Sequence, residues 1–179
     1  MTEKSQIRVS ADEYRRLPET NQPTELIGGQ VVVSPSPISD HQRVVRRLSR
    51  LIEDNMPSGE VMLSPMDVYF GDANVLQPDV FWLAEDSACI ERDGYFYGPP
   101  ELVVEVLSPA TSTRDKREKF DVYEASGVRE YWIVDVAGEH IEVWTLGGAS
   151  FQRQGVYVVG NGMPSSILGQ TLTLPDLFG

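Results

Sequence analysis

The sequence predicts one domain of the mixed α/β (α+β) class, in which helices flank a mixed β-sheet and an additional antiparallel meander follows. Three observations lead to this prediction. A chain of 179 residues is long enough for one core that buries roughly 70% of the unfolded surface. Its 41% apolar and 23% charged residues are typical of a folded globular protein. Its helical and strand-like segments alternate irregularly, so we treat residues 1–179 as a single domain without a repeated βαβ pattern.

The N-terminal part of the chain predicts a short helix followed by a hairpin. The helix covers residues 8–17, where Ser10 as N-cap and Glu13 three positions later form a capping box. Two strand-like runs within residues 24–33 then flank the pair Gly28-Gly29. Paired glycines favour the tight turns of β-hairpins, because both turn residues take positive φ values.

A longer amphipathic helix is expected from Ser39, capped together with Gln42, to about Asn55. One stripe of this helix is purely cationic and the opposite face is apolar. The cationic positions are Arg43, Arg46, Arg47 and Arg50, and the apolar positions are Val44, Val45, Leu48, Leu51 and Ile52. Two interpretations of the stripe remain: a solvated face that offsets nearby acids, which we favour, and a surface that contacts nucleic-acid phosphates.

The rest of the chain is expected to be rich in strands. Strands are predicted at 60–63, 67–70, 75–83 and 101–107, and none is assigned to the polar stretch 84–100. The run 101–107 is the most apolar of the chain and therefore predicts the centre of a sheet. A helix over residues 113–125 with Gly127 as its stop, a meander of strands at 129–136, 139–146 and 151–159, and a short apolar run within 165–178 complete the prediction.

Charge and composition exclude several classes of protein. The net charge of -12 and the pI near 4.5 argue against a general nucleic-acid coat protein, because such a surface repels polyanions. An enzyme with a local basic patch remains compatible, since eight of the 15 basic residues lie in the segments 43–50 and 114–119.

Neither a membrane span nor a secreted protein is expected. The chain has no apolar run that approaches about 18 residues and no apolar signal segment at its start. Its lone cysteine, Cys89, cannot form an internal disulfide, so we expect a cytoplasmic protein. The sequence motifs of dinucleotide-binding, P-loop, α/β-hydrolase and zincin proteins are all absent.

Glu105 is the most informative residue, because it interrupts the apolar strand 102–107, where both faces are expected to be buried. A buried carboxylate is unfavourable unless a metal ion or a basic side chain compensates its charge. The chain has only 3 lysines, and most of its arginines lie on predicted surface helices. The sequence therefore favours a metal ion over an ion pair in the core.

Asp79 follows Pro78 inside the second apolar strand, 75–83. A proline there removes a donor from the sheet and indicates an edge, a bulge or the start of a strand. If this strand pairs with the strand of Glu105, alternation allows the two carboxylates to meet on one face. Two adjacent acids repel each other unless a cation lies between them, and hard oxygen ligands favour Mg²⁺ or Mn²⁺ over Zn²⁺.

Lys119 is a third candidate. Asp115, Lys119 and Tyr123 recur every four residues, on one side of the helix that follows the Glu105 strand. Beside a pair of metal-bound carboxylates, an ammonium group can orient a water molecule or stabilise negative charge on a phosphate. A surface ion pair between Asp115 and Lys119 explains the spacing equally well.

Several segments carry a family resemblance. They are Gln77-Pro-Asp79, Val104-Glu-Val-Leu-Ser-Pro109, Arg114-Asp-Lys-Arg-Glu-Lys119, Gly127-Val-Arg-Glu-Tyr-Trp-Ile-Val-Asp135, Thr24-Glu-Leu-Ile-Gly-Gly-Gln30 and Pro37-Ile-Ser-Asp-His41. Together they resemble the Uma-type family of restriction-endonuclease-like proteins, which belongs to the PD-(D/E)xK nuclease superfamily. The resemblance extends over about residues 10–160 and rests mainly on the two longest segments, because short carboxylate patterns arise by chance.

The resemblance implies a restriction-endonuclease-like core and a role for each candidate. Asp79 corresponds to the aspartate of the first half-motif and Glu105 to the acidic residue of the second. Leu107 occupies the position of the superfamily lysine, and Lys119 on the following helix corresponds to the lysine of this family. Glu25 matches an early acidic residue that would complete a site for Mg²⁺ or Mn²⁺ with Asp79 and Glu105.

Two further residues correspond to positions of the family. Tyr123 is expected to support the acidic cluster with its hydroxyl group. His41 matches a recurrent histidine at the start of the arginine helix, where we favour a polar residue of a first helical turn over a catalytic group.

We expect a metal-dependent endonuclease that hydrolyses DNA phosphodiester bonds, contacts DNA through the arginine stripe and forms a homodimer. A catalytically inactive module that keeps the nuclease fold to bind nucleic acid or protein is the main alternative. The net charge and Leu107 favour that alternative. A hydrolase of small phosphoesters or nucleotides also remains open.

Overall fold

The computed structural model describes residues 8–18, 20–56, 58–107 and 113–179, without the side chains of residues 113–115. The helices are α1 (Ala11–Arg15), α2 (Ser39–Asn55) and α3 (Thr113–Ser126). The strands are β1 (Thr24–Ile27), β2 (Gln30–Val33), β3 (Glu60–Leu63), β4 (Val68–Tyr69), β5 (Val75–Leu76), β6 (Val80–Leu83), β7 (Ile90–Arg92), β8 (Tyr95–Tyr97), β9 (Leu102–Leu107), β10 (Glu130–Asp135), β11 (His140–Gly147), β12 (Ser150–Tyr157), β13 (Gly162–Ser165) and β14 (Gln170–Thr173). The predicted mixed α and β class is confirmed.

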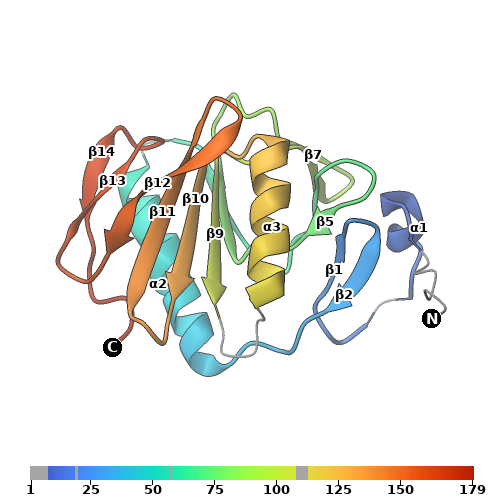
Figure 1. Ribbon diagram of the computed structural model, residues 1–179, viewed down its shortest axis with the longest axis horizontal. Coiled ribbons are helices and arrows are strands. Elements are labelled where there is room, and N and C mark those ends of the chain that lie inside the picture. The colour runs from blue at the N-terminus through green and yellow to red at the C-terminus, as the bar shows by residue number, and fades with distance from the viewer. Residues whose placement is uncertain (1–7, 19, 57, 108–112) are drawn as a thin grey trace, which may run out of the picture.

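The larger layer of the molecule is a mixed sheet with the strand order β12-β11-β10-β9-β6-β3. Strands β9 and β10 are parallel and are joined by α3, whereas the other neighbours in this sheet are antiparallel. Strand β9 lies between β10 and β6, as expected for the most apolar strand. Figure 1 shows α3 beside β9, while α2 passes behind β10 and β11.

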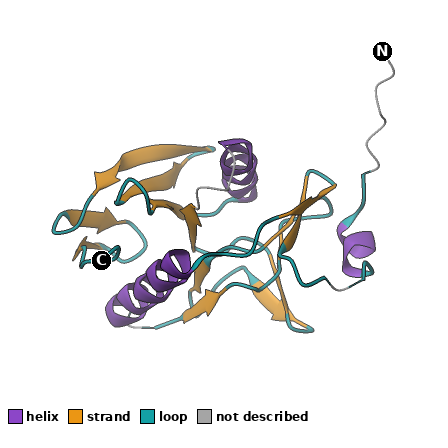
Figure 2. Cartoon of the chain, turned by 90° about the horizontal axis from the view of Figure 1, so that it is seen from below, coloured by secondary structure: helices purple, strands orange, loops and turns teal. Residues whose placement is uncertain are grey.

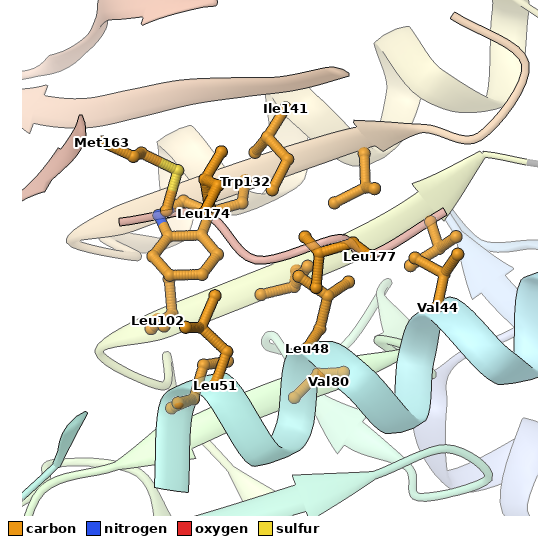
Figure 3. Packing of buried hydrophobic residues seen from close by; sticks show 14 of the residues in the cluster. Val44, Leu48, Leu51, Val80, Leu102, Trp132, Ile141, Met163, Leu174 and Leu177 are labelled. Carbon is orange, nitrogen blue, oxygen red and sulfur yellow. The ribbon is translucent and has the colours of Figure 1, made fainter. Parts of the chain in front are cut away.

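The α2 face of this sheet holds the first hydrophobic core. Val44, Leu48 and Ile52 are buried on the apolar side of α2, as its periodicity predicts. They pack against alternate residues of the sheet, such as Leu102 and Trp132. Figure 3 shows this packing and includes Leu174 and Leu177 from the C-terminal segment.

The opposite face of the sheet packs against α3. Phe81 of β6, Val103 of β9 and Tyr131 of β10 are buried there together with Tyr123 of α3. Figure 2 shows the two long helices on opposite sides of the strands. Glu105 belongs to this second face, because it alternates in phase with Val103.

A second sheet has the strand order β2-β1-β5-β4-β8-β7. The turn between β1 and β2 has positive φ values at Gly28 and Gly29, which confirms the predicted hairpin. Helix α1 packs on this sheet, and its capping box between Ser10 and Glu13 is present as predicted. The chain passes from this sheet into the larger one between β5 and β6, at residues 77–79.

Three local predictions need correction. Ser39 is not the N-cap of α2, because Ile38 holds the extended N-cap conformation and no side chain caps the helix. The expected strand 75–83 divides into β5 and β6, because Pro78 supplies no N–H group to a ladder. The polar stretch 84–100 contains the hairpin β7–β8, which pairs with β4. The C-terminal segment, for which a short apolar run was predicted, also contains the hairpin β13–β14.

No helix of the described residues is both long and apolar enough to cross a membrane.

Candidate active site

Asp79 and Glu105 lie across from each other where the chain changes sheets. Val80 of β6 is opposite Val104 of β9, so continuing the antiparallel register by one residue pairs Asp79 with Glu105. The main-chain N–H of Val106 donates to Asp79 Oδ2 at 2.8 Å, which fixes this carboxylate against β9. The predicted pairing of the two strands is therefore present.

Glu105 is 8% exposed, and its carboxylate has two partners on α3. The Nζ of Lys119 lies 3.0 Å from Oε1 and 3.1 Å from Oε2, and the Tyr123 hydroxyl donates to Oε1 at 2.5 Å. Burial raises the pKa of Glu105 to about 7, although the Lys119 charge opposes this shift. The carboxylates of Asp79 and Glu25 contribute to this raised pKa.

Lys119 also connects Glu105 to the second sheet. Its Nζ lies 2.8 Å from Glu25 Oε1 on β1, and this oxygen also accepts the main-chain N–H of Gln77 at 2.7 Å. Burial alone would lower the pKa of Lys119, but Glu105 and Glu25 together raise it above its ordinary value. Lys119 is therefore a permanently charged group at ordinary pH.

His41 approaches Asp79 from the first turn of α2. The imidazole is buried, and its Nε2 lies 3.3 Å from Asp79 Oδ2, while Nδ1 has no partner among the described residues. Burial lowers the pKa of His41, but the contact with Asp79 outweighs it, so the net pKa is raised. Its description as a polar residue of a first helical turn is incomplete, because the side chain belongs to the acidic cluster.

The cluster carries an excess of negative charge. Glu25, Asp79 and Glu105 contribute three carboxylates, whereas Lys119 is the one lysine or arginine in ion-pair contact with them among the described residues. Carboxylate oxygens are the ligands that Mg²⁺ and Mn²⁺ prefer, so the chemistry of the donors fits such an ion. The described residues contain no group of three or more His, Cys, Asp or Glu side chains arranged to hold a metal, and Lys119 lies between Glu25 and Glu105.

Comparison of the sequence with protein families shows the family to which the chain belongs. Residues 11–175 match the Uma2 family model, whose description is "Putative restriction endonuclease". The chain belongs to the Uma2 family. The expected family is thereby confirmed.

Two other proteins are similar to this chain. The "Uncharacterized protein sll1609" of Synechocystis sp. is 26% identical over 135 residues, which span 73% of this chain and 76% of that protein. The crystal structure of a putative nuclease belonging to DUF820 from Anabaena variabilis has a TM-score of 0.76 and a sequence identity of 20%. The match covers 95% of this chain and 97% of that one, and it shows that the two share a fold.

The Uma2 fold brings the predicted residues Glu25, Asp79, Glu105, Lys119 and Tyr123 into one cluster. Glu105 does form the buried ion pair that the sequence disfavoured, because Lys119 enters the core from α3. The alternative partner of Lys119, Asp115, has a side chain outside the described part of the chain, as do the residues 108–109 of the family motif.

The arginine stripe lies away from these contacts. Arg43 pairs with Asp40 at 2.6 Å on the surface, as the interpretation of a solvated face predicts. The guanidinium of Arg47 donates to the main-chain oxygen of Leu177 at 2.9 Å and so fastens the C-terminal segment to α2. Arg46 and Arg50 are exposed and make no ion pair with the described residues.

Two residues of the site were given no role from the sequence. Gln77 holds Glu25 with its main-chain N–H and Asp67 with its side chain, whose Nε2 donates to Oδ1 at 2.8 Å. Its place directly before Pro78 and Asp79, after two buried aliphatic residues, was the available indication. Asp67 offered none, because its relation to Gln77 depends on the second sheet.

Proposed function

We propose that this chain is a metal-dependent endonuclease that hydrolyses DNA phosphodiester bonds. The observation that carries the proposal is the placement of Asp79 opposite Glu105, with the Lys119 ammonium within 3.1 Å of the Glu105 carboxylate. A carboxylate pair beside a buried cation is suited to phosphoryl chemistry, in which negative charge must be neutralised. Membership of the Uma2 family supports the same conclusion.

Asp79 and Glu105 would hold Mg²⁺ or Mn²⁺, and Glu25 is the candidate for a third ligand. When bound, such an ion lowers the pKa of a water molecule and neutralises charge on the phosphate. The protein contributes the position of the ligands. The N–H of Val106 holds Asp79, the hydroxyl of Tyr123 holds Glu105, and the N–H of Gln77 holds Glu25.

Lys119 acts as a charged donor and not as a base. Its raised pKa keeps the ammonium protonated, so it can donate to a water molecule or to a phosphate oxygen. The protein thus places a fixed positive charge where negative charge develops on the phosphate. Leu107, at the position of the superfamily lysine, leaves this role to Lys119.

Contact with DNA would use the exposed arginines of α2. Arg43, Arg46 and Arg50 present guanidinium groups that bind phosphates and set the position of the DNA without reading its sequence. The net charge of -12 makes this binding weak and sensitive to salt. We also propose a homodimer, which would present two such arginine surfaces. Sedimentation velocity of the purified chain tests whether the dimer forms.

Cleavage assays test the proposal. We expect plasmid or single-stranded DNA to be cut at low salt with Mg²⁺ or Mn²⁺, and not in the presence of a chelator. Asp79→Ala and Glu105→Ala should abolish cleavage, whereas Glu53→Ala, at an exposed acid of α2, should cleave like wild type. Cleavage by either of the first two variants at the wild-type rate would reject the proposal.

The alternatives give different results in the same assays. A catalytically inactive module would bind DNA or protein without cutting it, and it would need no affinity for Mn²⁺. A hydrolase of small phosphoesters would act on nucleotides and leave polymers intact.

A further inference from the structure

A cavity of about 720 Å³ lies between α1, the β1–β2 hairpin and the strands β4 and β8. Its volume falls in the range of sites for small organic groups, roughly 300–1,000 Å³. Thr24, Val31 and Val33 line it from one face of the hairpin. Side chains alternate along a strand, so Glu25 points to the other face, toward Lys119. The cavity is therefore separate from the acidic cluster and lies directly behind it.

One wall of the cavity is aromatic. Tyr69 stacks on Tyr97, with ring centroids 4.8 Å apart, and meets Tyr95 edge to face at 5.8 Å. The guanidinium of Arg15 lies over the Tyr95 ring, 4.5 Å from its centroid. Arg15, Tyr69 and Tyr95 all line the cavity. Flat tyrosine rings and a planar guanidinium are the groups on which unstacked nucleobases stack in proteins.

Tyr69 adds an unused hydrogen-bonding group to this wall. Its side chain is only 6% exposed, and its hydroxyl has no hydrogen-bond partner among the described residues. Buried polar groups are nearly always paired, because an unpaired group loses its bonds to water without replacement. A polar atom of a ligand would supply the missing partner.

Asp67 and Gln77 supply the polar end of the cavity. The Gln77 side chain donates to Asp67 Oδ1 at 2.8 Å, and the half-buried carboxylate makes no ion pair with the described residues. Burial raises the pKa of Asp67, while the bond from Gln77 opposes the shift. Ring N–H or amino groups of a ligand would satisfy the second oxygen. Gln77 also holds Glu25, so one residue joins this cavity to the acidic cluster.

The charges of the lining select the ligand. Arg15 is the one cationic residue among the described residues that line the cavity, and it already stacks on Tyr95, whereas Asp67 is an anion. A phosphate group would meet as much repulsion as attraction there. A neutral heteroaromatic ring with N–H donors matches the aromatic wall and the carboxylate together.

We propose that this cavity binds an unpaired nucleobase of the nucleic-acid strand that the Asp79–Glu105 site cleaves. The proposal rests on the proposed function and narrows its substrate to single-stranded or locally unpaired DNA. The ring packs on the aromatic wall beside the Arg15–Tyr95 pair, and its N–H edge donates to Asp67. A base inside an intact duplex cannot enter, because it is stacked between its neighbours and paired.

Photochemical crosslinking without metal tests where a base binds. A single-stranded oligonucleotide with 5-iodouracil is irradiated with the wild-type chain in a chelator at low ionic strength, and the adducts are located by mass spectrometry. We expect adducts on Tyr95 or Tyr69, and at least a fivefold lower yield with the same oligonucleotide in a complete duplex. Adducts confined to other residues, or equal yields from both substrates, would overturn the proposal.

Conservative variants provide an independent readout. Asp67→Asn and Tyr69→Phe should each weaken binding of the single strand about fivefold in fluorescence anisotropy, without changing duplex binding. Tyr157→Phe, which removes a hydroxyl from β12, is the control and should bind like wild type. Melting temperatures near the wild-type value show that the variants fold. Wild-type affinity in both test variants would also reject the base-binding cavity.

The two proposals fail separately. Loss of crosslinks in the cavity, with cleavage that still depends on Asp79, would reject the base site and leave the nuclease in place. Crosslinks at Tyr95 in a chain that never cuts DNA would support the base site and reject the nuclease.

Discussion

The Lys119 ammonium lies 3.0 Å from Glu105 Oε1 and 3.1 Å from Oε2, in contact with both oxygens of the carboxylate. Both side chains are buried, and they come from α3 and from the central strand β9. The same ammonium contacts Glu25 on the second sheet. One lysine therefore joins the helix and both sheets at the point where the catalytic chemistry is proposed.

Lys119→Met should be strongly destabilising. It leaves Glu25 and Glu105 buried without their cation, which costs about 3–5 kcal/mol in comparable buried pairs. Urea denaturation followed by circular dichroism measures the loss. Lys116→Met is the matched control on the same helix, because its contact with Glu142 is more exposed and should contribute less than about 1 kcal/mol. Equal stability of the two variants would show that Lys119 does not hold the cluster together.

Tyr123→Phe should lower stability by about 1–3 kcal/mol, because it removes the buried hydroxyl that donates to Glu105 Oε1 at 2.5 Å. The ring stays in place, so the packing against Phe70 and Tyr131 is preserved. We also expect slower cleavage, since Glu105 loses a group that fixes its orientation. Denaturation and cleavage rates measure the two effects. An unchanged rate would confine Tyr123 to a structural role.

Glu130→Ala should release the C-terminal hairpin. Glu130 is fully buried and accepts hydrogen bonds from the Trp132 indole, from the N–H and hydroxyl groups of Ser166, and from the N–H of Ile167. Loss of these bonds should cost at least about 3 kcal/mol. In hydrogen exchange, the amides of β13 and β14 should lose protection before those of β9. Simultaneous loss of protection in all three strands would contradict this assignment.

How much of this architecture the sequence predicts depends on how local each feature is. The periodicity of α2 predicts its buried face, and Gly28-Gly29 predicts the hairpin turn, because both depend on residues close in the chain. Strand alternation also predicts that Asp79 and Glu105 meet. The contact of Lys119 with Glu25 joins positions distant in sequence, and only the family resemblance indicated that the two belong to one site.

Three further features were not predicted from the sequence. The strand β8 is only three residues long, and it pairs in parallel with β4 and antiparallel with β7. The N-cap of α2 falls on Ile38, and an isoleucine does not predict an N-cap because it has no side-chain acceptor. The cavity beside Asp67 is formed by α1, the β1–β2 hairpin and the strands β4 and β8, so no single segment indicates it.

Cys89 should be inert toward thiol reagents in the folded protein. Burial raises its pKa to about 12, and the charge of Glu101 adds to the shift. The thiolate is thus disfavoured in the folded state, and the associated stability is present below pH 9 and lost as the pH rises toward about 12. Iodoacetamide at pH 8 should modify Cys89 at least tenfold faster in the denatured chain than in the native chain. Rapid modification of the native chain would show that Cys89 is accessible.

The most direct test of the proposed metal site is a crystal of the chain soaked in Mn²⁺ and measured at a wavelength that gives an anomalous signal from manganese. We expect a strong anomalous peak bounded by the carboxylates of Asp79 and Glu105, with Lys119 within reach, and no such peak in crystals of Asp79→Ala. Wild-type crystals without a peak at saturating Mn²⁺, or with manganese only at surface carboxylates, would contradict the assignment of this cluster as a metal-dependent nuclease site.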